Sequence, residues 1–599
     1  MRLMKGTRGR GMGEGLEHRI EYVARLTNNG VGINGNSWLV TSLPYLVFSS
    51  ATSGGKPQRV VRVARQRTTT RFELGGSAYG GKYGTRQKLA VEGGEYVVTM
   101  VDGSKTVHYG PEAVAGLRGR LKKMVGADGV ETVAAYDGSQ RIVSLKRALA
   151  GTADGAGLYY TFATSGPHAG RLQVVEKRLW RAGVEQPVKR WVYSYHTGAA
   201  GEGSLNDLKT AGVEVFNAQS GEWERVATSY FRYYTASSAT GFKHGLKYSV
   251  GPEAYGRMAA AGLAPDIAAV PDAVLAGYAS VYREWNSQHR MTKQARWGGT
   301  LVETYARLSS AGGGVNWARR TVEAQPDGSQ VTTYFNGLNQ VVLRVLQKGA
   351  QSWPAYYEYD ADRRRVLEAG PDAIASFTLP TNPSTSVVVT LKSGDGLLKG
   401  TEYYPLDGSG GAGSAPGYLK KSWVKKGSGG TVVTQEEKTY TSFTTAGQTV
   451  YREETATRYR SETGGGSVPA VTSFGWQWQS GRLIPVQKTT TLPVVAAGEN
   501  GTGVAAVMVE RYDAQGNVTW VKDEAGVLGY GVWDGLTGAA VRQIADVDTQ
   551  RMDPAIVPAG WVTPAGGGLH LITDYQSDAQ GRWTQGLGPE HALEVAGAV

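Results

Sequence analysis

The stretch Tyr512-Asp513-Ala514-Gln515-Gly516-Asn517 and its later copy Ser577-Asp578-Ala579-Gln580-Gly581-Arg582 decide the fold of this chain of 599 residues. A weaker copy, Trp533-Asp534-Gly535-Leu536-Thr537-Gly538, lies between them. Counted from the first residue of each copy, the steps are 21 and then 44 residues, close to one and two units of the same length. A fixed period of this size is the sequence signature of a repeat architecture.

The parts of the repeated unit predict a β-hairpin. An aromatic residue such as Tyr512 ends one strand and packs its ring on the face of a sheet. The side chain of Asp513 bonds to backbone two residues on and starts a turn, and Gly516 supplies the positive φ that closes the turn. The residues that follow alternate and predict the return strand. Because a single hairpin is marginally stable in water, we expect each unit to lie beside its neighbours in one sheet.

Imperfect copies extend the pattern upstream. They are Tyr359-Asp360-Ala361-Asp362-Arg363, Phe335-Asn336-Gly337-Leu338-Asn339 and Tyr136-Asp137-Gly138-Ser139-Gln140. Asn339 stands where glycine is expected, and asparagine is the next most tolerant residue for a left-handed turn. Arg363 and Gln140 stand at the same position and depart from the rule.

The unit Tyr-Asp-x-x-Gly-Arg/Asn resembles the YD repeat of the RHS (rearrangement hotspot) proteins. The stretch from His244 to Tyr255 also resembles a segment of very large bacterial RHS proteins, so the resemblance covers roughly residues 20 to 595. It implies an all-β, mainly antiparallel fold, because long YD-repeat arrays coil as a continuous sheet into a hollow shell around a cargo. We expect this chain to form an incomplete turn of such a shell. The conserved core motif and variable domain that end toxin-carrying members are missing, so neither autoproteolysis nor toxin activity is assigned to any residue.

Four regions are predicted along the chain. Residues 1–15 form a disordered basic leader, 16–251 the N-terminal β region, and 285–599 the YD-repeat shell, which ends in mid-repeat. Residues 252–284 are rich in Ala, Met, Leu and Glu at helical intervals, and Pro252 suits the first turn of a helix. We expect a small helical insertion there that covers a face or an edge of the sheet.

The composition supports a folded, strand-rich protein and excludes several classes of site. The 84 glycines, 32 tyrosines and 15 tryptophans favour tight turns and antiparallel strands. The absence of cysteine excludes disulfides and cysteine-based metal sites. No signal peptide and no membrane-spanning segment are visible. The net charge of +12 fits basic side chains at solvent-facing strand positions, or alternatively an acidic polysaccharide partner; nucleic acid is a less favoured partner.

A search for chemistry predicts no catalytic, cofactor-binding or metal-ligating residue. The eight histidines lack metal-binding spacings, and no nucleophile elbow, phosphate loop or dinucleotide fingerprint is present. Two carboxylate pairs, Asp546 with Asp548 and Asp574 with Asp578, would serve glycoside hydrolysis only if they faced each other across a cleft. Trp476 and Trp478 lie two residues apart, so both rings are predicted on one sheet face. They are a candidate platform for glycan stacking, or else ordinary packing.

Three functions follow, in order of preference. The first is a non-enzymatic structural or interaction protein, a partial RHS/YD-repeat shell that encloses or displays a cargo or mediates cell-surface contact. Its partners would be other segments of a larger RHS protein or the cargo, and its location extracellular or at the cell surface. The second is a carbohydrate-binding adhesin, and the third a polysaccharide hydrolase. The residues predicted to shape the repeat turns are Tyr512, Asp513, Gly516, Asp578, Gly581, Trp533, Asp534, Tyr359 and Asp360.

Overall fold

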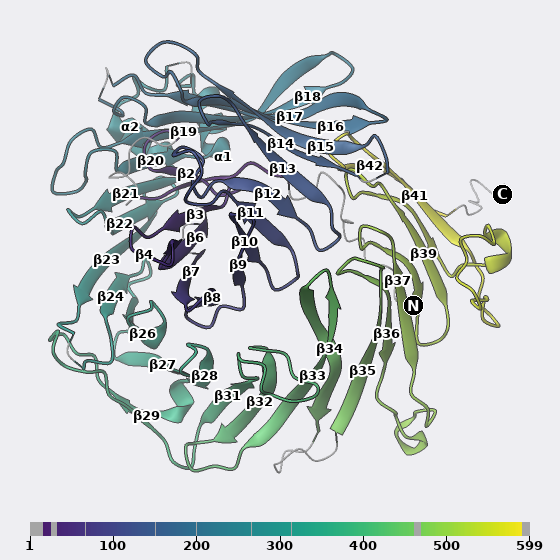
Figure 1. Cartoon of the computed structure of the whole chain (residues 1–599). Coiled ribbons are helices and arrows are strands. Elements are labelled where there is room, and N and C mark those ends of the chain that lie inside the picture. The colour runs from purple at the N-terminus through teal and green to yellow at the C-terminus, as the bar shows by residue number, and fades with distance from the viewer. Residues whose placement is uncertain are drawn as a thin grey trace, which may run out of the picture.

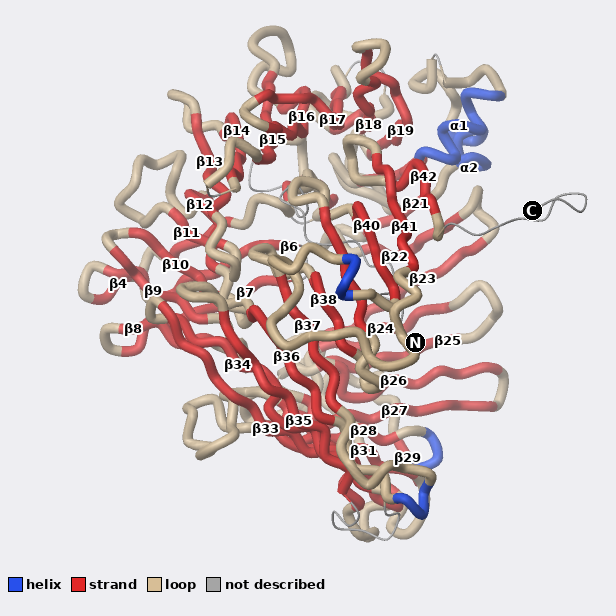
Figure 2. The backbone as a smooth tube through the Cα atoms, turned by 90° about the vertical axis from the view of Figure 1, so that its right-hand side faces the viewer, coloured by secondary structure: helices blue, strands red, loops and turns tan. Residues whose placement is uncertain are grey.

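In the described part of the chain, one antiparallel sheet of 36 strands dominates the architecture, as the sequence predicts for an all-β fold (Figure 1). The computed structural model describes residues 16–24, 33–65, 68–149, 151–198, 201–264, 266–312, 314–460 and 469–589. The predicted leader, residues 1–15, lies outside the described residues. Figure 2 shows strands throughout the described chain and both α-helices at one corner of the molecule.

The strands follow one another closely along the chain. Before the helices they are β1 (Ile20–Tyr22), β2 (Trp38–Val40), β3 (Tyr45–Phe48), β4 (Thr52–Ser53), β5 (Lys56–Pro57), β6 (Arg59–Arg65), β7 (Thr68–Gly75), β8 (Ala78–Gly81), β9 (Lys88–Glu92), β10 (Glu95–Thr99), β11 (Lys105–His108), β12 (Leu121–Val125), β13 (Glu131–Tyr136), β14 (Ile142–Ala148), β15 (Gly155–Phe162), β16 (Leu172–Arg181), β17 (Val184–Tyr195), β18 (Leu208–Asn217), β19 (Glu222–Tyr233) and β20 (Leu246–Val250). The helices are α1 (Pro252–Ala260) and α2 (Asp272–Tyr278).

After the helices the chain returns to strands. They are β21 (Val281–Trp285), β22 (Met291–Arg296), β23 (Leu301–Ser309), β24 (Arg319–Ala324), β25 (Gln330–Phe335), β26 (Val341–Lys348), β27 (Gln351–Tyr359), β28 (Arg365–Ala369), β29 (Ile374–Phe377), β30 (Val389–Leu391), β31 (Leu397–Tyr403), β32 (Leu419–Lys426), β33 (Val433–Thr445), β34 (Gln448–Tyr459), β35 (Pro469–Trp478), β36 (Pro485–Thr491), β37 (Val507–Tyr512), β38 (Val518–Lys522), β39 (Leu528–Trp533), β40 (Ala540–Ala545), β41 (Leu571–Ser577) and β42 (Trp583–Leu587). Short 3-10 turns lie at Pro371–Ala373, Ala497–Glu499 and Thr549–Arg551.

The large sheet is a meander in which almost every strand pairs with its neighbours in the chain. Two small hairpins, β4–β5 and β29–β30, are left out of it, so β3 pairs with β6 and β28 pairs with β31. Among the described residues β3 and β42 each pair on one side only, so the sheet is open at both ends. Antiparallel pairing throughout is what short hairpin turns require.

The sheet coils back on itself. In Figure 1 the strands from β13 to β42 follow one another around a ring, and β6 to β10 lie within its outline. The turn after β39 reaches the end of β16, where Arg181 and Asp534 form an ion pair between residues 353 positions apart. The sheet meets itself here without closing, as expected for a sheet that coils into part of a shell.

The N-terminal segment forms a second layer on one face of the sheet. β1 pairs only with β2 among the described strands, and the pair packs on β12 to β20. Leu16 and Trp38 are buried there against Leu145, Leu158 and Tyr233. This cluster of aliphatic and aromatic side chains is the largest core of the described chain, and its burial is the main force that holds the two layers together.

The two α-helices cover another part of the sheet, as the sequence predicts for an insertion. Met258 of α1 and Leu275 of α2 are fully buried against Tyr230 and Val250 of β19 and β20. The chain rejoins the sheet at Val281, within the range 252–284 predicted for the insertion, because β21 pairs with β20 and β22. The helical segment proper is therefore 252–278.

A buried arginine fastens this helical segment to the sheet. Arg232 of β19 is 4% exposed, and its guanidinium donates to the carbonyl oxygens of Ile267 (3.1 Å) and Val270 (2.9 Å). It also donates to the Asp272 carboxylate at 2.7 Å. Since a buried guanidinium needs partners for its donors, this arrangement fixes where the connection between α1 and α2 crosses the sheet.

Candidate functional site

The repeated turn has the geometry that its sequence predicts. The Asp513 carboxylate accepts hydrogen bonds from the backbone N–H groups of Gln515 (2.9 Å) and Asn517 (2.8 Å), and Gly516 has φ +84°. In the later copy, Asp578 accepts from the N–H groups of Gln580 and Arg582, both at 2.9 Å, and Gly581 has φ +73°. The turn thus satisfies its own backbone donors.

The residue that follows the glycine position adds a side-chain hydrogen bond to the aspartate of the same turn. The second carboxylate oxygen of Asp513 accepts from Asn517 Nδ2 at 2.8 Å, and that of Asp578 accepts from Arg582 Nε at 2.7 Å. Burial alone would raise the pKa of Asp578, but the hydrogen bonds from Arg582 and Gln580 outweigh it and lower the pKa. This explains why arginine or asparagine follows the glycine in the repeat.

The upstream copies keep the same backbone although the glycine is lost. Gln140, Asn339 and Arg363 have φ values of +60°, +65° and +68°. In the copy at Tyr359, the Asp360 carboxylate accepts from both the N–H and the Nε of Arg364, each at 2.8 Å. These hydrogen bonds offset the strain of a left-handed residue with a Cβ atom.

Two further copies of the turn were not predicted from the sequence. Asn286 accepts from the N–H of Arg290, with His289 at φ +56°. Asp523 accepts from the N–H of Val527, with Gly526 at φ +82°. The Trp533 copy is one residue longer, since its left-handed residue is Gly538 and Asp534 accepts from the N–H of Thr537. An Asp or Asn four residues before an aliphatic or basic residue is the signal that would have found the missed copies.

Aromatic side chains close the open ends of the hairpins. An aromatic residue, in most cases the last of its strand, donates its O–H or N–H to the carbonyl of the first residue of the strand before it. These bonds are Tyr136 to Leu121 (2.6 Å), Tyr195 to Leu172 (2.6 Å), Tyr233 to Leu208 (2.9 Å), Trp285 to Leu246 (2.9 Å), Tyr359 to Val341 (2.9 Å), Tyr440 to Leu419 (2.9 Å) and Trp533 to Val518 (2.8 Å). The aromatic of the repeat is therefore a hydrogen-bond donor as well as a packing group.

We expect Tyr359→Phe to weaken its hairpin and Tyr357→Phe to leave it almost unchanged. Both residues lie on β27, but within the described chain only the Tyr359 hydroxyl donates a hydrogen bond, to the Val341 carbonyl. Loss of such a bond costs about 1 kcal/mol. Hydrogen exchange of β26 to β28 measures the effect locally, and equal exchange in the two variants would contradict the role of the hydroxyl.

The coiled sheet contacts itself along a line that we call the inter-turn seam. Turns of β8 to β16 meet turns of β28 to β40, and both partners advance together along the chain. The contacts are Gly84 against the Asp362 carbonyl, Arg86 over the Tyr418 ring (4.0 Å), Gln448 Nε2 to Gly103 O (2.8 Å), Leu483 N to Ala127 O (2.9 Å) and Arg181 Nη2 to Asp534 Oδ2 (2.6 Å). The seam combines a backbone hydrogen bond, a side-chain-to-backbone hydrogen bond, an ion pair and close packing.

The two tryptophans predicted to share a face do so. The ring centroids of Trp476 and Trp478 lie 6.2 Å apart, and Trp478 stacks on Phe443 at 4.5 Å with an interplanar angle of 4°. Lys488 Nζ lies 5.9 Å from the Trp476 ring, and Arg452 lies 5.7 Å from the Trp478 ring. All three rings are half-buried, so they form an aromatic row with basic side chains at its border.

The carboxylates of the two predicted pairs form hydrogen bonds or ion pairs within the protein. Asp546 accepts from the N–H groups of Gly568 (2.8 Å) and Leu569 (2.9 Å), and Asp548 accepts from the N–H of Gln550 (3.0 Å). Asp574 forms a two-pronged ion pair with Arg542 at 2.6 and 2.8 Å. Within the described ranges no three His, Asp or Glu residues lie close enough to hold a metal ion.

His244, from the segment that resembles large RHS proteins, ties three distant segments together. Its Nδ1 lies 2.8 Å from the carboxylate of Asp207, which has no exposed surface. Asn36 Nδ2 and the N–H of Ser204 donate to the same carboxylate, each at 2.8 Å. These contacts make the cluster a joint between the N-terminal layer and the sheet.

Two buried histidines make the fold sensitive to acid. Burial lowers the pKa of His18 to about 3, where it lies among the rings of Tyr160, Trp191 and Tyr193. Burial likewise lowers the pKa of His108 to about 3. Since an unfolded histidine titrates near 6.5, the unfolded chain binds more protons between about pH 6.5 and 3, and stability falls as pH falls through that window.

The expected loss is about 1.4 kcal/mol per pH unit for each histidine below pH 6.5. Melting temperatures between pH 7.5 and 5 measure it before most carboxylates titrate. His18→Phe keeps a ring in the aromatic pocket and removes one of the histidines whose pKa is lowered, so its melting temperature should depend less steeply on pH. A variant with the same slope as the unmodified chain would contradict the contribution of His18.

Comparisons with known proteins give the following similarities. No family model and no curated protein matches the chain. Among solved structures, it is similar to a chain of "Crystal Structure of TcdB2-TccC3-Cdc42" with 10% identity and a TM-score of 0.35, covering 90% of this chain and 27% of that one. It is also similar to a chain of "Crystal Structure of TcdB2-TccC3" with 9% identity and a TM-score of 0.34, covering 91% and 28%. The chain therefore spans little more than a quarter of the length of these structures.

Proposed function

We propose that this protein is a non-enzymatic structural segment, a length of RHS/YD-repeat shell wall that encloses or displays a cargo or mediates contact at a cell surface. The observation that carries the proposal is the continuous sheet of 36 strands that coils until turns 353 residues apart meet at the seam. Repeated turns and hairpin-closing aromatics make each unit a building block that depends on its neighbours. Partners would be further segments of a larger protein or the enclosed cargo.

The last described strand, β42, supports this function because it offers an edge. All five residues of β42 are exposed, including Trp583 (53%) and Leu587 (50%), and the strand pairs only with β41 in the described chain. An unpaired strand is a template for another strand. In a shell wall, that edge is where the next repeat is added.

The proposal predicts that the isolated chain associates through β42. Light scattering should show a mass that rises with protein concentration. Leu587→Lys should reduce this association, because lysine on an edge strand opposes pairing. Leu569→Lys is the matched control, since Leu569 is 68% exposed but lies outside the edge strand. A molecular mass that stays monomeric at every concentration would contradict the proposal that β42 pairs with a strand of another chain.

A carbohydrate-binding adhesin is the second candidate, favoured by the aromatic row of Phe443, Trp476 and Trp478. Half-buried aromatic faces with basic side chains beside them suit the flat faces of sugar rings. Glycan-array binding by the unmodified chain that is lost in Trp478→Ala but kept in Trp353→Ala would support this function. Trp353 is 40% exposed on β27 and serves as the control.

Among the described residues, no helix has the length and the apolar character that crossing a membrane requires. We place the protein outside the cell or at the cell surface, in line with its resemblance to RHS proteins. Detection of the chain in culture medium or on intact cells by protease shaving tests this location.

A further inference from the structure

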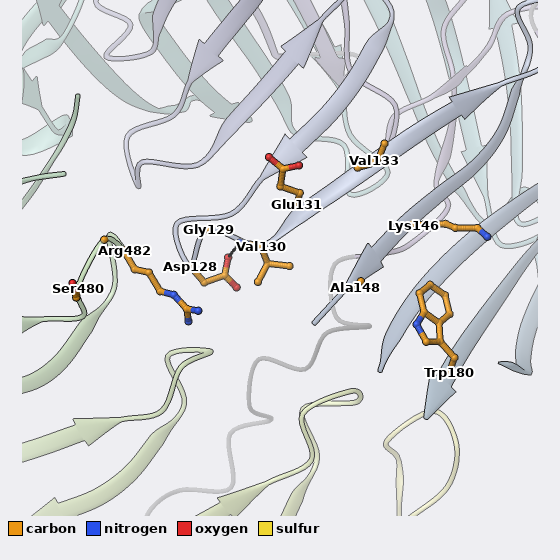
Figure 3. A pocket seen from close by; sticks show the side chains of 11 residues that line it. Asp128, Gly129, Val130, Glu131, Val133, Lys146, Ala148, Trp180, Ser480 and Arg482 are labelled. Carbon is orange, nitrogen blue, oxygen red and sulfur yellow. Dashed lines mark hydrogen bonds between the residues drawn. The ribbon is translucent and has the colours of Figure 1, made fainter. Parts of the chain in front are cut away.

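A pocket of about 650 Å³ lies directly on the inter-turn seam. One wall comes from β13, β14 and β16 and from the turn before β13, and the other comes from the turn between β35 and β36. Figure 3 shows Arg482 entering from one side, beside Asp128, and Trp180 standing on the opposite side. The volume is within the range of small-molecule sites, roughly 300–1,000 Å³.

Two glycines leave room for the indole ring of Trp180, which is the aromatic wall of the pocket. Trp180 lies across from Gly155 on the neighbouring strand, and a Cβ atom on Gly155 would come within 2.3 Å of the indole ring. A Cβ atom on Gly157 would come within 3.2 Å of the same ring. The indole therefore lies flat against the backbone of β15, and this fixed position gives the pocket a rigid aromatic wall.

The polar side chains that line the pocket carry no net charge and include both hydrogen-bond donors and hydrogen-bond acceptors. Asp128 and Glu131 contribute two carboxylates, and Lys146 and Arg482 two cations; the Glu131 carboxylate is also ion-paired with Lys123 Nζ at 2.6 Å. The Asp128 carboxylate accepts one bond from the N–H of Val130 (3.1 Å), and Arg482 donates to the Ala514 carbonyl (3.1 Å). A carboxylate accepts about four hydrogen bonds and a guanidinium donates five, so both groups retain capacity for a ligand.

We propose that this pocket binds a neutral saccharide of one or two rings, stacked on Trp180 and hydrogen-bonded by Asp128 and Arg482. Sugar hydroxyls donate and accept, which matches a lining that does both. The C–H face of a sugar ring suits the negative face of an indole. A strongly charged ligand would meet a lining of zero net charge, and an apolar ligand would strip water from four charged groups without replacing their hydrogen bonds.

The site exists only while the seam is closed. The backbone bond from Leu483 N to Ala127 O, at 2.9 Å, joins the residues next to Arg482 and Asp128 in the chain. A ligand that needs both walls binds the closed coil and not the open one, so it stabilises the seam. This goes beyond a shell wall, which needs no ligand, and it concerns a site separate from the row at Trp478.

The test titrates the whole chain with cellobiose, chitobiose, maltose and lactose at millimolar concentration, with adenosine monophosphate as a charged probe that carries a purine. We expect at least one disaccharide to change tryptophan fluorescence and to slow hydrogen exchange in residues 126–130 and 479–484. Trp180→Ala and Arg482→Ala should each weaken that binding by about ten-fold or more. Trp297→Ala and Trp353→Ala, at side chains that are 72% and 40% exposed and lie outside the pocket, should bind as the unmodified chain does.

Three outcomes would overturn the proposal. They are no response to any disaccharide, a response that survives both pocket variants, and a response to adenosine monophosphate alone. Thermal melting of each variant separates lost binding from lost folding. Arg482 lies on a turn, so its variant keeps the test decisive even if Trp180→Ala unfolds the hairpins around it. Loss of binding in Trp478→Ala alone would assign the saccharide to the aromatic row instead.

Discussion

Arg232→Leu should detach the helical segment 252–278 from the sheet and destabilise the region by about 3 kcal/mol or more. The substitution leaves the carbonyl oxygens of Ile267 and Val270 without their buried donor and removes one of the two partners of Asp272, which keeps its ion pair with Lys247. Hydrogen exchange should accelerate across 252–278. The apolar surface of Tyr230 and Val250 beneath the helices should become exposed, so the variant should also associate more readily.

A matched control lies in the same segment. Arg257 of α1 is an exposed residue whose ion pair with Glu253 is also at the surface. Arg257→Leu should therefore change stability by less than about 0.5 kcal/mol and leave exchange in 252–278 as it was. If the two arginine variants behaved alike, Arg232 would not be the fastening point and apolar packing alone would hold the helices.

Gly84→Ala should open the first contact of the inter-turn seam. Gly84 has φ +70°, and a Cβ atom there would lie 2.2 Å from the carbonyl oxygen of Asp362. The left-handed backbone costs an alanine about 1–2 kcal/mol, and relief of the clash requires one backbone to move away from the other. We expect a loss of about 2–4 kcal/mol and faster hydrogen exchange in the distant turn 360–364.

Gly76→Ala separates the backbone strain of a left-handed alanine from the clash with the Asp362 carbonyl. Gly76 has φ +62° in the neighbouring turn, but apart from the residue itself and its two chain neighbours no heavy atom of the described chain lies within 4 Å of the position that an alanine methyl group would take there. It should show the backbone strain without any effect on residues 360–364. Faster exchange at 360–364 in both variants would mean that the seam responds to general loosening of β7 and β8 and not to the contact at Gly84.

The turns were predictable from the sequence because their chemistry is local. Asp513 and Gly516 act within six residues, so the signal survives in any copy that keeps both. Gln140 and Arg363 did not fit the glycine rule, although their backbones are left-handed. The offsetting hydrogen bonds come from the aspartate side chain of the same turn, an energetic balance that residue preferences at a single position do not express.

The seam and its pocket could not be predicted in this way. Gly84 and Gly76 look alike in the sequence, and only the first meets a distant backbone. Trp180 resembles any aromatic on a strand until Gly155 is placed beside it and Arg482 opposite. These contacts depend on how far the sheet twists over many strands, and small changes of twist per strand add up over the coil.

The meander has a consequence for how the protein is made. Each strand pairs with one already synthesised, so the sheet can grow hairpin by hairpin from the ribosome without long-range search. The bond between Gln448 and Gly103 is different, because its partners are 345 residues apart. At about 5–20 residues per second, roughly 20 to 70 s of synthesis separate them. During that interval the turns of β8 to β16 lack their partners across the inter-turn seam. A chaperone or a ligand therefore has access to surfaces that the finished coil buries.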